Sequence, residues 1–251
     1  MTEKPKDNLL DKSLNIINCF VDINDQWGVR ELASYLGYTV PTTHRILLQL
    51  RDRGIVQYDD AKSKYLIGTE LIRISSKVYS KSDLQRIVKP YLEKLAAKYE
   101  ETICLLMLRE ESNQIFWADK VNGPKPLQYI IPIGELQPLP YGSSGKAILA
   151  YLSEENIDEI LRDEKFNEKQ VEEVKEEILD IRQNRYHVSI SERLEGSTGI
   201  GSPILNENNK PIGSIILTAP SPRVSQDVID RASVDIKKYA MEISEIFGAT
   251  I

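Results

Sequence analysis

The stretch from Val29 to Ile67 constrains the fold more than any other part of this chain. Two short segments with apolar residues at helical spacing flank Gly37, and two short β-prone runs joined by a polar tip follow them. Gly37 stands where a left-handed residue ends a helix, and Thr39 followed by Pro41 is typical of a helix start. The order helix, turn, helix, hairpin predicts a winged helix-turn-helix.

The second helix of this motif carries short polar side chains in its first turn and then a basic one. Such a helix end can approach base edges and phosphates closely, and Arg45 can donate two parallel hydrogen bonds. The basic tip of the hairpin is suited to backbone phosphates. A solvated helix face is the alternative interpretation of Arg45. The predicted DNA-binding residues are Pro41, Thr42, Thr43, His44, Arg45, Gln49, Lys62 and Lys64.

The charge of the chain is unevenly distributed. The net charge is −6 over 251 residues, but positions 41–81 hold eight basic and four acidic side chains, a local charge of +4. A basic segment attached to an acidic body indicates one module that faces DNA and another with a different task.

Composition points to an ordinary globular protein. The sequence has no run of about 18 apolar residues, so it predicts no membrane span. The polar N-terminus lacks the apolar core of a signal peptide. Cys19 and Cys104 lie in separate apolar patterns and are expected to be buried thiols rather than a disulfide. We therefore expect a cytoplasmic protein.

The remainder of the chain predicts a helical linker and an α+β domain. The expected boundaries are 8–68 for the winged helix-turn-helix domain, 69–81 for the linker helix and 82–251 for the second domain. Within the second domain, apolar runs and alternation predict helices interrupted by strands. Strands are expected over 102–108, 114–121, 127–133, 186–190, 198–205 and 211–219, and helices over 84–99, 145–152, 154–161, 168–185 and 225–247.

Familiar motifs stand in both parts of the chain, at positions 31–33, 42–47, 65–68, 90–96, 141–150, 185–186 and 213–220. These segments, in this order, resemble the IclR family of bacterial transcriptional regulators, and the resemblance covers about residues 10 to 250. The resemblance implies an N-terminal winged helix-turn-helix, a linker and a GAF-like α/β effector-binding domain. It also implies binding to operator DNA as a homodimer or homotetramer, and control by a small organic-acid or aromatic-acid effector.

Two stretches of the second domain are candidates for the effector pocket. Gly145 is expected to open a helix whose free N–H groups favour a carboxylate, and positions 196–202 offer backbone amides and short hydroxyls. A tight turn with capping serines is the alternative interpretation. The predicted effector-binding residues are Tyr141, Ser143, Ser144, Gly145, Glu192, Gly196, Ser197, Thr198, Ser202, Ile216 and Thr218.

No motif predicts catalysis, a metal or a cofactor. Ser143 and Lys146 match the pattern S-x-x-K, but the S-D-N and K-T-G motifs that accompany it in acyl enzymes are missing. Only His44 and His187 are available for a triad or a metal site. We expect a transcriptional repressor with a small carboxylate effector. The alternative is an enzyme or a ligand-free interaction module that uses the second domain.

Overall fold

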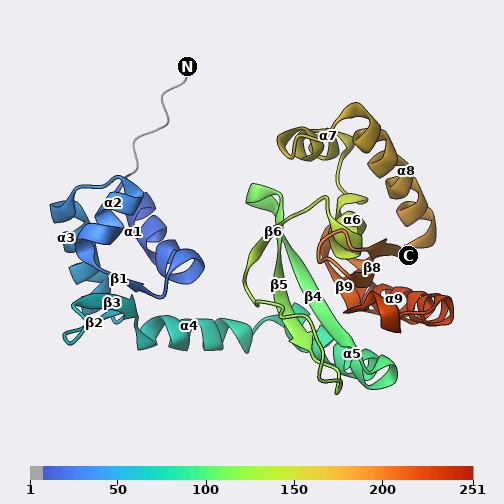
Figure 1. The fold of residues 1–251 in the computed structure, drawn as a ribbon, viewed down its shortest axis with the longest axis horizontal. Coiled ribbons are helices and arrows are strands. Elements are labelled where there is room, and N and C mark those ends of the chain that lie inside the picture. The colour runs from blue at the N-terminus through green and yellow to red at the C-terminus, as the bar shows by residue number, and fades with distance from the viewer. Residues whose placement is uncertain (1–7, 251) are drawn as a thin grey trace. The chain divides into compact units, whose positions relative to one another are not determined.

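The computed structural model describes residues 8–250, which divide into two compact units, one ending at Ser82 and the other beginning at Asp83 (Figure 1). Residues 1–7, to which the expectation of no signal peptide applies, lie outside the described residues. No helix within residues 8–250 is long and apolar enough to cross a membrane.

The helices of the first unit follow from local signals. They are α1 (Leu9–Asn18), which continues as the π-helical turn η1 (Cys19–Ile23), then α2 (Val29–Leu36), α3 (Val40–Asp52) and α4 (Thr69–Tyr79). Gly37 ends α2 with a φ of 67°, and the Thr39 side chain accepts a hydrogen bond from the Thr42 amide at the start of α3. The predicted helix-turn-helix is therefore confirmed.

A small antiparallel sheet completes this unit. Its strands are β1 (Gln26–Trp27), β2 (Val56–Asp59) and β3 (Lys64–Ile67), in the order β1-β3-β2. The β2–β3 hairpin is the predicted wing. The sequence analysis missed β1, because two residues are too short for a periodic signal. The buried core of the unit comprises Ile16, Cys19, Phe20, Trp27, Leu32, Ile46, Leu47, Leu50, Val56 and Tyr65.

The second unit is built on a six-stranded antiparallel sheet in the order β6-β5-β4-β9-β8-β7. The strands are β4 (Thr102–Arg109), β5 (Gln114–Val121), β6 (Leu136–Pro138), β7 (His187–Ile190), β8 (Ser197–Leu205) and β9 (Pro211–Pro220). The 3-10 turns η2 (Glu110–Ser112) and η3 (Ser221–Arg223) follow β4 and β9.

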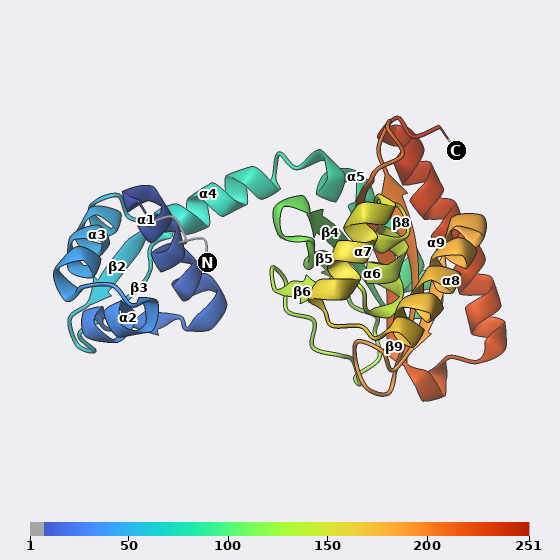
Figure 2. The same ribbon diagram turned by 90° about the horizontal axis from the view of Figure 1, so that it is seen from above.

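Helices cover both faces of this sheet, which confirms the predicted α+β class. They are α5 (Asp83–Tyr99), α6 (Gly142–Leu149), α7 (Glu154–Asp163), α8 (Glu168–Asn184) and α9 (Gln226–Ile246). Within this unit α6, α7 and α8 lie on one side of the strands and α5 and α9 on the other (Figure 1), and the view from above has α6 and α7 in front of the strands (Figure 2).

Alternation along the central strand β4 explains the two layers of core. Ile103 and Leu105 pack with α5 and α9, whereas Cys104 and Leu106 pack with α6 and α8. Cys19 and Cys104 are both buried and free, as expected.

The predicted strand over 127–133 is wrong. This segment is a loop, and β6 pairs with β5 in its place. Leu127, Ile130 and Ile133 are 68%, 92% and 51% exposed, so most of the apolar side chains that suggested a strand point to the surface, whereas Ile131 is buried. Pro132 also lacks the N–H that a strand of the ladder needs.

Candidate DNA interface and ligand cavity

Helix α3 turns one polar face outward. Pro41, His44, Arg45 and Gln49 are exposed on it. Thr42 is half-buried, and its hydroxyl accepts a hydrogen bond from the Thr39 hydroxyl at 2.9 Å. These five positions are available for contacts along one side of the helix.

Thr43 corrects the predicted set. Its side chain is fully buried and its hydroxyl donates to the Thr39 carbonyl at 3.2 Å. Thr43 therefore belongs to the packed face of α3, between the exposed residues that flank it in the sequence, and its side chain does not reach DNA.

The two wing lysines differ in their surroundings. Lys62 is exposed at the tip, with its ammonium 4.0 Å from the Asp59 carboxylate. Lys64 lies 3.3 Å from Glu31 and so links the wing to α2. The Gly28 amide, followed by Lys64, lowers the pKa of Glu31. Lys62 is therefore the more exposed of the two lysines and forms the longer ion pair.

The second unit encloses a small cavity of about 10 Å³ beside the first turn of α6, room for roughly one water molecule. Helix α6 comes this close to β8 because glycines face it. A Cβ atom on Gly199 would lie 2.7 Å from Ser143 Oγ, and one on Gly201 would lie 2.9 Å from the Ser143 carbonyl carbon. The cavity is lined by Trp117, Gly142, Ser143, Ser144, Ser189, Arg193, Leu194, Ser197, Gly199, Ile216 and Thr218.

Five of the predicted effector residues line this cavity: Ser143, Ser144, Ser197, Ile216 and Thr218. They come from α6, β8 and β9, three elements far apart in the sequence. The hydroxyl groups of Ser143 and Ser144 are buried and have no hydrogen-bond partner among residues 8–250. Unpartnered buried hydroxyls are available to a ligand.

The start of α6 differs from the prediction. The helix begins at Gly142, three residues before Gly145. Its first amides are already occupied, because the Gly142 N–H donates to Glu192 at 3.1 Å and the Ser143 N–H donates to Ser189 Oγ at 2.8 Å. Gly145 does not line the cavity. A Cβ there would lie 2.0 Å from the Leu139 carbonyl oxygen, so this glycine serves close packing.

The remaining predicted residues are engaged elsewhere. Tyr141 donates from its hydroxyl to Glu164, and Gly196 forms a turn with a φ of 72°. Thr198 donates to the Ser221 hydroxyl, and Ser202 donates to the Arg185 carbonyl. Thr198 follows Ser197 on β8, and neighbouring residues of a strand face opposite sides of the sheet. None of these four residues lines the cavity.

Arg193 is the main residue that the sequence analysis missed. Its Nη2 donates to the carbonyls of Tyr141 and Pro138, the latter at 2.9 Å, and its Nη1 donates to Gln137 at 3.4 Å. Its Nε is buried without a partner, and within residues 8–250 it forms no ion pair. Burial lowers the pKa of Arg193 to about 10, so it remains protonated at neutral pH.

An open cleft of about 260 Å³ adjoins the cavity and shares Trp117, Arg193 and Leu194 with it. The cleft is further lined by Ile130, Ile131, Pro132, Glu135 and Gln137. Its walls are mostly apolar, and Arg193 stands where cleft and cavity meet.

A charged cluster lies behind the cavity. The Lys146 ammonium is 2.7 Å from Glu177 and 2.8 Å from Glu192, the carboxylate that accepts from Gly142. Ligand atoms of Glu177, His187 and Glu192 lie within 4.8 Å of one another, a spacing that suits a metal ion. The ammonium already contacts both carboxylates, so Lys146 supplies the positive charge that a metal would bring.

Two family models match the chain. The model described as the IclR helix-turn-helix domain matches residues 9–60, and the one described as the bacterial transcriptional regulator IclR C-terminal matches residues 76–245.

Several known proteins are similar over nearly the whole chain. The HTH-type transcriptional regulator KipR of Bacillus subtilis is 25% identical, covering 98% of this chain and 99% of that protein. The transcriptional repressor IclR of Escherichia coli is 24% identical, covering 95% of this chain and 89% of that protein. The solved structure of an IclR transcriptional regulator from Alicyclobacillus acidocaldarius has a TM-score of 0.87 at 20% identity, over 97% of this chain and all of that one.

Proposed function

This chain belongs to the IclR family of bacterial transcriptional regulators, and from that premise we propose how it contacts DNA and what controls it. It is a DNA-binding regulator and not an enzyme. The proposed division of labour is DNA binding by residues 8–68, coupling by the helix over 69–81, and effector binding and oligomerisation by residues 82–251. Acting as a repressor in the cytoplasm is part of this proposal.

In the proposed complex α3 enters the major groove. Arg45 and Gln49 reach base edges, while Pro41, Thr42 and His44 bring the first turn close to the backbone. Lys62, and to a smaller extent the paired Lys64, contact phosphates. The exposure of this face and the exposed position of Lys62 at the tip of the wing support the assignment.

A mobility-shift titration tests the role of α3. The probe is the genomic fragment that the purified protein enriches most strongly. The Arg45→Ala variant is expected to bind it at least about tenfold more weakly, as the loss of one bidentate base contact implies. Arg86→Ala is the matched control, because Arg86 is exposed on α5 and, among residues 8–250, forms its ion pair with Asp83 alone. Equal binding by Arg45→Ala and the wild type would show that α3 is not the reading helix.

The effector is proposed to be a small organic acid, and Arg193 carries this proposal. Arg193 is half-buried, and among residues 8–250 its guanidinium forms no ion pair, although the charge of Glu192 acts on its pKa. Its buried Nε has no partner, and such a group is suited to bind an anion. The hydroxyls of Ser143 and Ser144 add two donors beside it. Because the cavity has room for roughly one water molecule, one oxygen of the carboxylate fits there, and the body of the ligand lies along Trp117 and Leu194 in the cleft.

Tryptophan fluorescence tests this proposal with a panel of small carboxylic acids. Trp117 lines both the cavity and the cleft, whereas Trp27, the other tryptophan, lies in the core of the first unit. We expect a saturable change with at least one acid, its disappearance in Trp117→Phe, and at least about tenfold weaker binding in Arg193→Gln. Arg182→Gln, on α8, is the control variant. Undiminished binding in Arg193→Gln would refute the proposed site, and no response to any acid would favour the ligand-free interaction module.

Self-association, assigned above to residues 82–251, is proposed to involve exposed apolar side chains of the first unit as well. Leu10 and Val21 of α1–η1 are 67% and 62% exposed, and Val78 of α4 is 63% exposed. Exposed apolar side chains that form one contiguous patch mark an interface, and these three residues are the candidates for such a patch. Sedimentation velocity is expected to give a dimer or tetramer for the wild type and smaller species for Leu10→Glu combined with Val78→Glu. Unchanged sedimentation of that variant would exclude these residues from the interface.

Control by the effector then requires two arrangements of the paired DNA-binding units. Half-sites are separated by about one helical turn of DNA or a multiple of it, so only one arrangement fits the operator. An effector that binds the two arrangements with different affinity shifts the equilibrium between them.

A further inference from the structure

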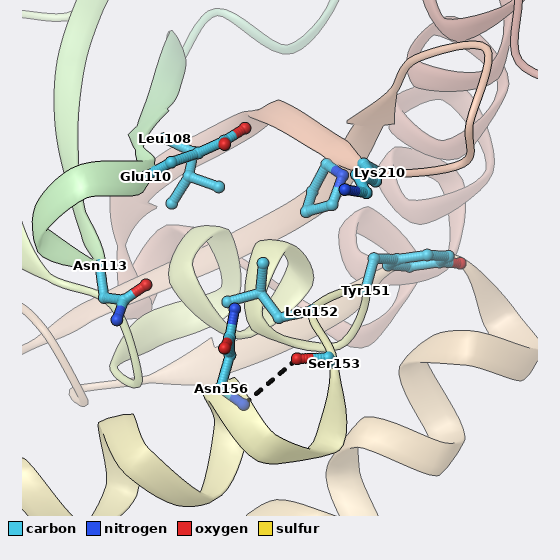
Figure 3. Close-up of a pocket in the computed structure, with 9 residues that line it drawn as sticks. Leu108, Glu110, Asn113, Tyr151, Leu152, Ser153, Asn156 and Lys210 are labelled. Carbon is cyan, nitrogen blue, oxygen red and sulfur yellow. Dashed lines mark hydrogen bonds between the residues drawn. The ribbon is translucent and has the colours of Figure 1, made fainter.

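A second pocket lies at the C-terminal end of α6, whereas the cavity described above lies at the N-terminal end of that helix (Figure 3). Its volume is about 180 Å³, and it shares no lining residue with the cavity or the adjoining cleft. Helix α6 has eight residues, so its ends are about 12 Å apart. The pocket is lined by Leu108, Glu110, Asn113, Tyr151, Leu152, Ser153, Asn156, Lys210 and Pro211.

Part of the pocket wall is apolar. Leu108 comes from the end of β4, Leu152 from the corner between α6 and α7, and Pro211 from the start of β9. The ring of Tyr151 stands at one side, with its hydroxyl directed away from the other lining side chains (Figure 3). These side chains offer a surface for a small aliphatic group.

Two carboxamide groups face this surface. Asn113 follows η2 in a left-handed conformation with a φ of 50°, and its N–H donates to the Glu110 carbonyl. Asn156 lies in the first turn of α7, where its N–H donates to the hydroxyl of the N-cap residue Ser153. Their backbones are thus held, while their side chains make no hydrogen bond within residues 8–250 and point into the pocket (Figure 3).

Opposite charges complete the lining. Glu110 and Lys210 contribute a carboxylate and an ammonium group to the same pocket. Among residues 8–250 neither side chain forms an ion pair or a hydrogen bond, with each other or with a third residue. The pocket therefore presents one positive group, one negative group and two carboxamides around an apolar floor.

We propose that this pocket binds a small zwitterionic α-amino acid with an aliphatic side chain. Lys210 receives the carboxylate of the ligand, Glu110 receives its ammonium group, and the side chain lies on Leu108, Leu152 and Pro211. Each carboxamide offers both a donor and an acceptor to the remaining lone pairs and protons of the ligand. A dry cavity of about 150 Å³ holds benzene, so a pocket slightly larger suits an amino acid of the size of valine.

Nuclear magnetic resonance of the ¹⁵N-labelled full chain tests the proposal with L-valine as the probe. The side-chain amide signals of Asn113 and Asn156 are expected to shift and to saturate below about 10 mM ligand. Two analogues remove one charge each. The acid 3-methylbutanoate lacks the ammonium group and 2-methylpropylamine lacks the carboxylate, and each is expected to bind at least about tenfold more weakly, because a charge-assisted contact is lost.

Variants assign the contacts. Glu110→Gln and Lys210→Gln are each expected to weaken L-valine binding about tenfold, whereas Glu111→Gln and Lys169→Gln, exposed positions outside the pocket, leave it unchanged. Arg193→Gln is also expected to leave it unchanged, which separates this pocket from the effector cavity. The proposal is overturned if the two amide signals do not move, if either analogue binds as well as L-valine, or if binding is lost only in Arg193→Gln.

Discussion

The Lys146 ammonium lies 2.8 Å from Glu192 Oε2, and that same oxygen accepts the hydrogen bond from the Gly142 amide. The first turn of α6 is therefore held by a carboxylate whose charge is balanced by a lysine one turn further along the same helix. Glu177 of α8 contacts the same ammonium at 2.7 Å. One buried cation thus joins α6, α8 and the loop that carries Arg193.

Replacing Lys146 tests how much this cluster of charges contributes to the stability of the protein. Lys146→Met leaves two carboxylates facing each other without a cation. Both carboxylates are about a third exposed, so we expect the free energy of unfolding to fall by about 2–3 kcal/mol, less than for a fully buried pair. Urea denaturation measures this change in the free energy of unfolding. Lys169→Met, at the exposed pair with Glu173, is the control and should cost less than about 0.5 kcal/mol. A similar small loss for Lys146→Met would show that the cluster adds no stability.

The stability of the second unit should depend on the protonation of His187. Burial lowers the pKa of His187, and the positive charge of Lys146 lowers it further. The negative charges of Glu177, Glu192 and Asp180 act in the opposite direction, but the pKa remains below its ordinary value. The unfolded chain therefore takes up the proton at higher pH than the folded protein. Full stability is present above the ordinary histidine pKa of about 6.5 and is lost as the pH falls toward the lower folded value.

Urea denaturation at about pH 7.5 and pH 5.5 measures this dependence. The free energy of unfolding of the wild type should be lower at the acidic pH than at the higher pH. The difference should be smaller for the His187→Gln variant. His44→Gln, which changes the exposed histidine of α3, should behave as the wild type does. If His187→Gln lost as much stability as the wild type, another group would be responsible.

Gly199→Ala should close the effector cavity. The added methyl carbon would lie 2.7 Å from Ser143 Oγ and 3.1 Å from Ile216 Cδ1, in a space that holds roughly one water molecule. We expect effector affinity, followed by Trp117 fluorescence, to fall at least about tenfold while effector-free DNA binding is retained. Gly28→Ala is a control, since its methyl would meet no atom closer than 3.7 Å. Wild-type effector affinity in Gly199→Ala would place the ligand elsewhere.

Lys62→Ala should weaken DNA binding without changing sequence preference. A phosphate contact releases about one counterion, so the slope of log affinity against log salt concentration should decrease by about one. Lys64→Ala should have a smaller effect because its ammonium already pairs with Glu31. Mobility shifts at several salt concentrations on operator and random fragments measure both. A change confined to the operator fragment would instead indicate base recognition by the wing.

The local structure of the first unit and the family of the chain could both be predicted from the amino-acid sequence. Gly37 and Thr39 act within their own helix ends, so neighbouring residues suffice to predict α2 and α3. Apolar runs and alternation likewise predicted most strands of the second unit. A strand buried on both faces shows a continuous apolar run, and one buried on a single face shows alternation.

Which residues meet at the cavity is set by packing between elements that are distant in the sequence. From the sequence, Arg193 is indistinguishable from a solvated loop residue, but in the fold it donates to the carbonyls of Pro138 and Tyr141. The start of α6 likewise depends on Ser189 and Glu192, which lie nearly fifty residues later in the chain. Likewise, the loop over 127–133 has a strand-like sequence, but β6 takes its place beside β5. Burial and hydrogen-bond partners are set by residues distant in the chain, and no local pattern encodes them.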